Sequence, residues 1–225
     1  MFIERRAFLK LPAFAAVGTL AGIREEFEGP VTFDAFVSQV GAMAKSLIAE
    51  AAPEEENYLQ QVAALAGQID RVPDATMGQP YKGVIRSGMN YRGSGIVVVQ
   101  WSMEAGLTYP AHNHPHYNAI TMGLEGECRI RNFDIVGDAP ELDSKKAFAV
   151  RETQNQLLTP GRVTSIMATN RDNIHTFRTE SKRARGIDVM TLVGKHIGFA
   201  FVAIDEKSRN GQGICQARWS EYLAG

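Results

Sequence analysis

The sequence predicts a mainly β protein, a small β-barrel or sandwich preceded by two N-terminal helices. Beyond Pro73, short stretches rich in β-branched residues alternate with glycine-containing turns, whereas the segment before it has helical hydrophobic spacing. The chain has 225 residues, enough for one substantial core. We therefore expect an N-terminal segment over 1–24, a helical segment over 25–72 and one β domain over 73–225.

The N-terminal segment resembles a twin-arginine export signal. Residues 4–10 read ERRAFLK and are followed by a mildly apolar run, although Glu4 stands where serine or threonine is usual. The resemblance implies a periplasmic or otherwise exported protein; an ordinary helix with a basic start, in a cytoplasmic protein, is the alternative. The apolar run is shorter than the roughly 20 residues that cross a bilayer, so no membrane span is expected.

Two helices are expected between Val31 and Ile69. Apolar residues recur at three- and four-residue spacing on both sides of Pro53, which interrupts the run. These apolar positions are Phe33, Phe36, Val40, Met43, Leu47, Ile48, Leu59, Val62, Leu65 and Ile69.

Strands are expected at six places in the β domain. The stretches are GIVVVQWSM at 95–103, NAITMGL at 118–124, CRIRNFDIV at 128–136, GRVTSIMAT at 161–169, GIDVMTLVG at 186–194 and GFAFVAI at 198–204. Short strands separated by turn signals predict a sandwich or barrel rather than alternating strands and helices.

The overall charge argues against nucleic acid as a partner. Charged residues make up 22% of the chain, and the formal net charge is -1, so no net field attracts polyanions or anionic membranes. Two cysteines, Cys128 and Cys215, are too few for a disulfide framework, and we expect them to be separate.

Three of the five histidines lie close together, in the string AHNHPH at 111–116. Residues i and i+2 of a strand face the same side, so His112 and His114 can present two imidazoles to one ion. His116 continues the alternation, but the proline before it disturbs the strand. Two ligands are too few for a tight site, and His175 is the candidate third ligand.

The histidine spacing resembles the two sequence motifs of the cupin superfamily. Gly106 is followed, after five residues, by His112-x-His114, as in the first motif. LTPG at 158–161, followed by a strand and then His175, resembles the second motif. The resemblance implies a jelly-roll β-barrel.

Within that superfamily the chain resembles the thiol dioxygenases, namely cysteine dioxygenase, cysteamine dioxygenase and the plant cysteine oxidases. Most metal-binding cupins add a glutamate beyond the histidine pair, where this chain has Asn118 or Ala119. HNHP at 112–115 is similar to the His-Asp-His-Pro string of the plant enzymes, and NIHTFR at 173–178 and GIDV at 186–189 resemble their later strings.

This resemblance implies a mononuclear non-haem Fe(II) centre that oxidises a small, cysteine-like thiol to its sulfinate with O2. The implied ligands are His112, His114 and His175. Neutral imidazoles also suit Zn, Ni, Cu or Mn, which remain alternatives. The implied partners are the thiol and O2, with the oligomeric state left open.

Three further residues are candidates for roles around the ion. Asp188 can orient a ring N–H of a ligating histidine or contact the substrate amine, unless it faces solvent. Arg86 lies near the place where cysteine dioxygenase has its carboxylate-binding arginine. Tyr109, like Tyr117, can hydrogen-bond oxygen or substrate, although packing at the mouth of the barrel is the simpler account.

Two other functions fit the same residues. One is a metallocupin, an oxygenase or isomerase, that acts on a non-thiol substrate; Asn118 as a weak ligand or a metal other than iron would favour it. The other is an exported cupin that binds a metal or a small solute without turnover.

Overall fold

The computed structural model describes residues 30–49, 55–168, 171–193 and 199–223. The proposed signal segment, 1–24, lies outside these ranges, so the export signal stays a prediction. The described residues form α1 (Phe33–Ala49), α2 (Glu55–Ala66), β1 (Ile85–Gly93), β2 (Ile96–Glu104), β3 (Thr108–Asn113), β4 (Tyr117–Glu125), β5 (Cys128–Val136), β6 (Phe148–Leu158), β7 (Val163–Met167), β8 (Ile174–Thr179), β9 (Arg183–Leu192), β10 (Phe199–Asp205), the 3-10 turn η1 (Glu206–Ser208) and β11 (Ile214–Leu223).

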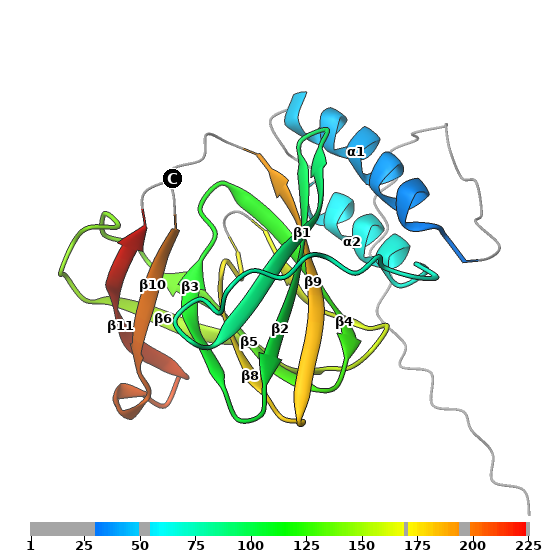
Figure 1. Cartoon of the computed structure of the whole chain (residues 1–225). Coiled ribbons are helices and arrows are strands. Elements are labelled where there is room, and N and C mark those ends of the chain that lie inside the picture. The colour runs from blue at the N-terminus through cyan, green and yellow to red at the C-terminus, as the bar shows by residue number, and fades with distance from the viewer. Residues whose placement is uncertain (1–29, 50–54, 169–170, 194–198, 224–225) are drawn as a thin grey trace, which may run out of the picture.

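The strands form two connected layers (Figure 1). One is a five-stranded sheet in the order β1-β2-β9-β4-β7, and the other is a closed six-stranded ring in the order β10-β11-β6-β5-β8-β3. The predicted fold class, a mainly β barrel preceded by two helices, is confirmed. Neither of the described helices is long and apolar enough to cross a bilayer.

The two helices cover the outer face of the five-stranded sheet (Figure 1). Alternate residues of a strand point to opposite faces, so Val98, Ile120 and Val189 meet the helices from neighbouring strands. Phe36 of α1 and Leu59 of α2 are almost fully buried against this face. The helices therefore bury the side of the sheet that faces away from the ring.

The inner face of the sheet packs against the ring and forms a second core. Trp101 of β2 contributes to it from the sheet, and Tyr109, Cys128 and Phe177 contribute from the ring. A Cβ atom at Gly186 would lie 2.4 Å from Cζ2 of Trp101, so only glycine leaves room for the indole here. The predicted histidine site lies at this interface between the two layers.

The six-stranded ring encloses a third core of its own. Phe133, Phe148, Ile174 and Trp219 are buried there together with Cys215. Both cysteines of the chain, the other being in the second core, are free and buried, as expected. Around the histidines, strands β3 and β8 are therefore buried on both faces, one toward the sheet and one toward the interior of the ring, whereas Thr108, Pro110 and Arg178 are exposed farther along.

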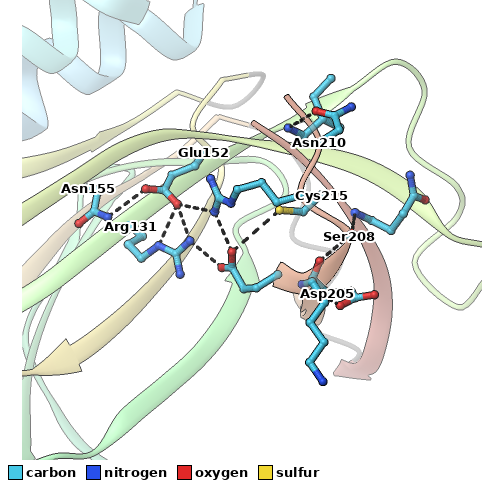
Figure 2. Close-up of polar contacts among 12 residues, drawn as sticks. Arg131, Glu152, Asn155, Asp205, Ser208, Asn210 and Cys215 are labelled. Atoms are coloured by element: carbon cyan, nitrogen blue, oxygen red, sulfur yellow. Dashed lines mark hydrogen bonds and ion pairs between the residues drawn. The ribbon is translucent and has the colours of Figure 1, made fainter. Parts of the chain in front are cut away.

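A cluster of ion pairs ties η1 to the ring (Figure 2). Arg131 of β5 pairs with Glu152 of β6 and, at 2.6 Å, with Glu206 of η1. Arg209 contacts the same two carboxylates at 3.0 Å and 2.7 Å. The cluster joins β5 and β6 to the turn between β10 and β11, and its partly exposed position limits each pair to about 1 kcal/mol or less.

Candidate metal centre

Backbone pairing brings the distant histidines together. His112 of β3 lies directly opposite His175 of β8, and a β-bulge precedes it, since Tyr109 pairs with Phe177 only two residues along β8. The bulge places Tyr109 and His112 on the same inner face, although they are three residues apart. His114 follows directly after the last residue of β3.

The three imidazoles converge on one point. Nε2 of His175 lies 3.0 Å from Nε2 of His112 and 3.0 Å from Nε2 of His114. The three possible ligand atoms all lie within 4.8 Å of one another. Among the described residues, one group of three or more histidine, cysteine, aspartate or glutamate side chains is close enough to hold a metal ion, and it is this one.

The spacing of the nitrogen atoms fits a metal ion. Two nitrogen atoms bound to one ion at about 2.1 Å and at a right angle to each other lie about 3.0 Å apart. His112 and His114 stand at that distance from His175. Without an ion, a proton on Nε2 of His175 can form one hydrogen bond within the trio, whereas an ion takes all three lone pairs. The donor set therefore fits a first-row transition metal.

Burial keeps the imidazoles neutral, which a metal ligand requires. Desolvation lowers the pKa of His112 to about 4, against the opposing effect of its bond to Pro110. Desolvation also lowers the pKa of His114 and of His175 well below the usual value, and the neighbouring imidazoles lower them further.

The tautomer of one ligand is fixed by the backbone. Nδ1 of His112 lies 3.0 Å from the carbonyl oxygen of Pro110, which can only accept, so Nδ1 carries the proton and Nε2 is free to ligate. Nδ1 of His175 is buried without a hydrogen-bond partner in the described residues. Its ring is oriented by packing, with the Phe177 ring 4.5 Å away.

One asparagine that sequence reasoning missed positions the loop of His114. Oδ1 of Asn173 accepts the backbone N–H of His114 at 2.9 Å. Its Nδ2 donates to the carbonyl oxygens of Tyr117 at 3.3 Å and Ala168 at 3.0 Å. The string NIHTFR contains this residue, but only the fold shows that it reaches back to the loop after β3.

Asp188 faces the interior from the five-stranded sheet. Its Oδ1 accepts hydrogen bonds from Oγ1 of Thr121 at 2.7 Å and from Nε1 of Trp101 at 3.3 Å. Burial raises its pKa to about 6, although these two hydrogen bonds act in the opposite direction. Among the described residues no histidine donates a hydrogen bond to Asp188. Its hydrogen bonds are therefore not those of a carboxylate that orients a metal-ligating histidine.

Asp188 borders a space that solvent can reach. It lies deep between the two layers and yet keeps some accessible surface, and the same holds for His114. A solvent-facing position on the outside of the barrel, one of the two sequence-based alternatives, is therefore wrong. The carboxylate instead stands across the interior from the ring that carries the histidines.

Tyr109 packs against the candidate centre. Its ring edge meets the ring of His112 at 4.7 Å between centroids, and it is 9% exposed. Burial raises the pKa of its hydroxyl, so the phenol stays protonated at neutral pH. Tyr109 can therefore donate a hydrogen bond but carries no charge.

Three other residues considered from the sequence are not brought to the centre. Arg86 is exposed on β1, where its guanidinium donates to the carbonyl oxygen of Gly78 at 3.4 Å. His116 is exposed in a turn with φ 64, so the strand alternation ends before it. Asn118 faces the helices, and its amide donates to Glu55 at 3.1 Å. Asn118 is thus directed away from the three imidazoles.

Comparison with known proteins gives no match by family model and none among curated proteins. Solved structures resemble the chain over a little more than half its length. One is the cupin domain of Cnp3 from Schizosaccharomyces pombe, with 11% identity and a TM-score of 0.39 over 54% of this chain and 72% of that one. Another is a Klebsiella pneumoniae protein with a double-stranded β-helix domain, with 17% identity and a TM-score of 0.38 over 55% of this chain and 84% of that one.

These structural neighbours are cupin proteins. A recombinant oxalate oxidase in complex with glycolate is also similar, with 18% identity and a TM-score of 0.40 over 57% of this chain and 59% of that one. At such values the likeness concerns the arrangement of the strands. The assignment of this chain to a β-barrel rests on its own sheet topology.

Proposed function

We propose that this protein is a mononuclear non-haem iron dioxygenase that oxidises a small thiol to its sulfinate. The observation that supports it best is the convergence of three neutral imidazoles in a group that includes no carboxylate among the described residues. His112, His114 and His175 would hold the ion. When bound, Fe(II) supplies the Lewis acidity and the electron transfer that couple a thiolate to dioxygen, RS⁻ + O2 → RSO2⁻.

The ligand set suits an anionic substrate. Three neutral imidazoles add no negative charge to the site, so a thiolate meets less electrostatic repulsion than it would beside a ligating carboxylate. The burial of His112 and His175, at 5% and 0% exposure, excludes bulk water from their rings. Charge attraction in the site is therefore strong.

Asp188 would select thiols that carry an amine. Its pKa of about 6 leaves the carboxylate ionised at neutral pH, and Thr121 and Trp101 hold it in place. An ionised carboxylate facing the interior attracts an ammonium group. We expect cysteine and cysteamine to be better substrates than 3-mercaptopropionate. Tyr109, a neutral donor beside His112, would hydrogen-bond the substrate or dioxygen.

Metal analysis followed by oxygen uptake tests the proposal. The purified protein, reconstituted with Fe(II), should consume oxygen when cysteine or cysteamine is added and should form the corresponding sulfinate. His175→Ala should abolish both iron retention and uptake. His116→Asn is the matched control, because it removes an exposed histidine outside the cluster and keeps a residue type that tolerates positive φ.

Two outcomes would contradict the proposal. Fe(II)-loaded protein that consumes no oxygen with any of the three thiols would refute it. Oxygen uptake or isomerisation with a non-thiol substrate would favour another metallocupin instead. Asp188→Asn should raise the KM for cysteamine and leave that for 3-mercaptopropionate unchanged, which separates substrate binding from general damage.

We further propose that the chain is exported by the twin-arginine route. The string ERRAFLK at 4–10 and the apolar run after it support this. Replacing Arg5 and Arg6 by lysine should retain the protein in the cytoplasm of a bacterial host. Equal distribution of the two versions between the compartments would contradict export.

A further inference from the structure

A hollow of about 390 Å³ lies on the opposite face of β3 and β8 from the three histidines. Asn113 and Ile174 line it, and each stands next in sequence to a histidine that points the other way. The rest of the lining comes mainly from β5 and from the loop that follows it. The volume is in the range of pockets that bind small molecules.

The lining carries negative charge without a basic side chain. Asp134 and Glu141 contribute carboxylates, and no lysine, arginine or histidine of the described residues lines the hollow. Neither carboxylate forms an ion pair in the described residues. One oxygen of Asp134 accepts the backbone N–H of Asp172. Arg151, opposite Asp134 on β6, lines a separate hollow, but its charge lowers the pKa of Asp134 against the larger raising effect of burial.

The floor of the hollow is aromatic. The rings of Phe133 and Trp219 line it, and both belong to the core of the six-stranded ring. Nε1 of Trp219 donates to the carbonyl oxygen of Pro140 at 2.9 Å, which fixes the indole against the loop above it. An apolar body bound here would cover the edges of these rings without displacing the core.

The side-chain amide of Asn113 also lines the hollow. Asn113 is 7% exposed, and its Oδ1 accepts the backbone N–H of Ala200 at 2.7 Å. Its Nδ2 donates to no group in the described part of the chain, and the residue lines the hollow. Nδ2 is not among the buried polar atoms that lack a partner, so it is open to solvent, and a ligand oxygen would replace water as its acceptor.

We propose that this hollow is a second binding site, for a small organic ammonium ion that also carries a hydroxyl or carbonyl oxygen. The ammonium pairs with Asp134 and Glu141, the apolar body lies on Phe133 and Trp219, and the oxygen accepts from Asn113. The proposal does not depend on the metal or on the proposed reaction, because none of the three histidines lines the hollow.

A series of ligands of matched shape tests the charge preference. The probes are trans-4-aminocyclohexanol, trans-1,4-cyclohexanediol and trans-4-hydroxycyclohexanecarboxylate, which share a hydroxyl and a saturated ring and differ in charge. None absorbs where tryptophan is excited, so the emission of Trp219 reports binding, and calorimetry measures the affinity. The aminoalcohol should bind saturably and at least about fivefold more tightly than the diol, and the carboxylate should not bind.

Paired variants separate the site from the overall charge. Asp134→Asn with Glu141→Gln should weaken binding of the aminoalcohol by about tenfold or more. Asp138→Asn with Asp143→Asn is the matched control, because these exposed residues belong to the same loop but do not line the hollow. The control should bind within about twofold of the wild type.

Three results would overturn the proposal. They are no saturable binding of the aminoalcohol up to about 50 mM, equal affinity for all three probes, and equal weakening in the two double variants. Trp219→Phe should remove the fluorescence signal while calorimetric binding persists, and a signal that survives would place the ligand elsewhere.

Discussion

Metal binding to the three histidines should release almost no protons near pH 5.5. An imidazole with the ordinary pKa of about 6.5 is about ten-elevenths protonated at that pH, so three of them would release about 2.7 protons on binding an ion. Burial lowers the pKa of His112 to about 4, so it would release about 0.03 proton. Burial also lowers the pKa of His114 and of His175 well below the usual value.

The same arithmetic predicts that the affinity of the three histidines for a metal ion is nearly constant between pH 7.5 and pH 5.5. Three ordinary imidazoles would lose about a thousandfold in affinity between pH 7.5 and pH 5.5, because protons compete for each nitrogen. For this site we expect a change of less than about twofold over that interval, and a steep loss only below about pH 4. The sign follows from burial, which disfavours the protonated form.

Calorimetry with Zn(II), a redox-inert probe, measures both quantities. Titrations at one pH in buffers of different ionisation enthalpy give the number of protons released. Release of about two or more protons at pH 5.5 would refute the reasoning, because the imidazoles would then be ordinary. His175→Ala should lose the binding heat at both pH values, which assigns the heat to this site.

Three further substitutions test the surroundings of the centre. The raised pKa of about 6 makes ionised Asp188 unfavourable in the folded state. Asp188→Asn should therefore become more stable relative to the wild type as pH rises from about 4 to 7, by up to about 3 kcal/mol. Denaturant unfolding at pH 4 and at pH 7 measures the difference in unfolding free energy, and the same difference at the two pH values would contradict the prediction. Gly186→Ala should destabilise by about 1–3 kcal/mol and shift the emission of Trp101, since the new Cβ would lie 2.4 Å from the indole. Asn173→Ala should lower Zn(II) affinity by about ten- to a hundredfold by releasing the His114 loop, and an unchanged affinity would show that the loop is held by other contacts.

The elements that the sequence predicted best are those with strong periodicity and clear boundaries. Pro53 interrupts the helical spacing of the apolar residues, and α1 and α2 lie on either side of it in the sequence. The stretch CRIRNFDIV coincides with β5, Cys128–Val136. β6, Phe148–Leu158, was not predicted, because its middle reads as polar on both faces, although Pro160 and Gly161 mark a turn after its end. β11 was also missed, although its buried Cys215, Ala217 and Trp219 alternate with exposed polar residues, which is a strand pattern.

The grouping of the histidines needed more than strand alternation. Alternation pairs His112 with His114, but only the resemblance to the cupin motifs connected them with His175, because nothing local specifies which strands become neighbours. The sequence signal for the bulge between Tyr109 and His112 is Pro110, because proline within a sheet is confined to edges and bulges. For Arg86, in contrast, strand alternation argues against a place in the site. Ile85 faces the inner core, so the next residue, Arg86, must point outward.

The precision of the candidate centre follows from the burial of β3 and β8 on both faces around His112 and His175. A strand with one solvated face can twist or slip at little cost, whereas one packed on both faces has its position fixed by two cores. His175 points toward the sheet and Ile174 toward the interior of the ring, and both are almost fully buried. The closed ring thus holds the backbone of the ligands in place without a hydrogen bond to every imidazole. This explains how His175 can keep its orientation although Nδ1 has no partner in the described residues.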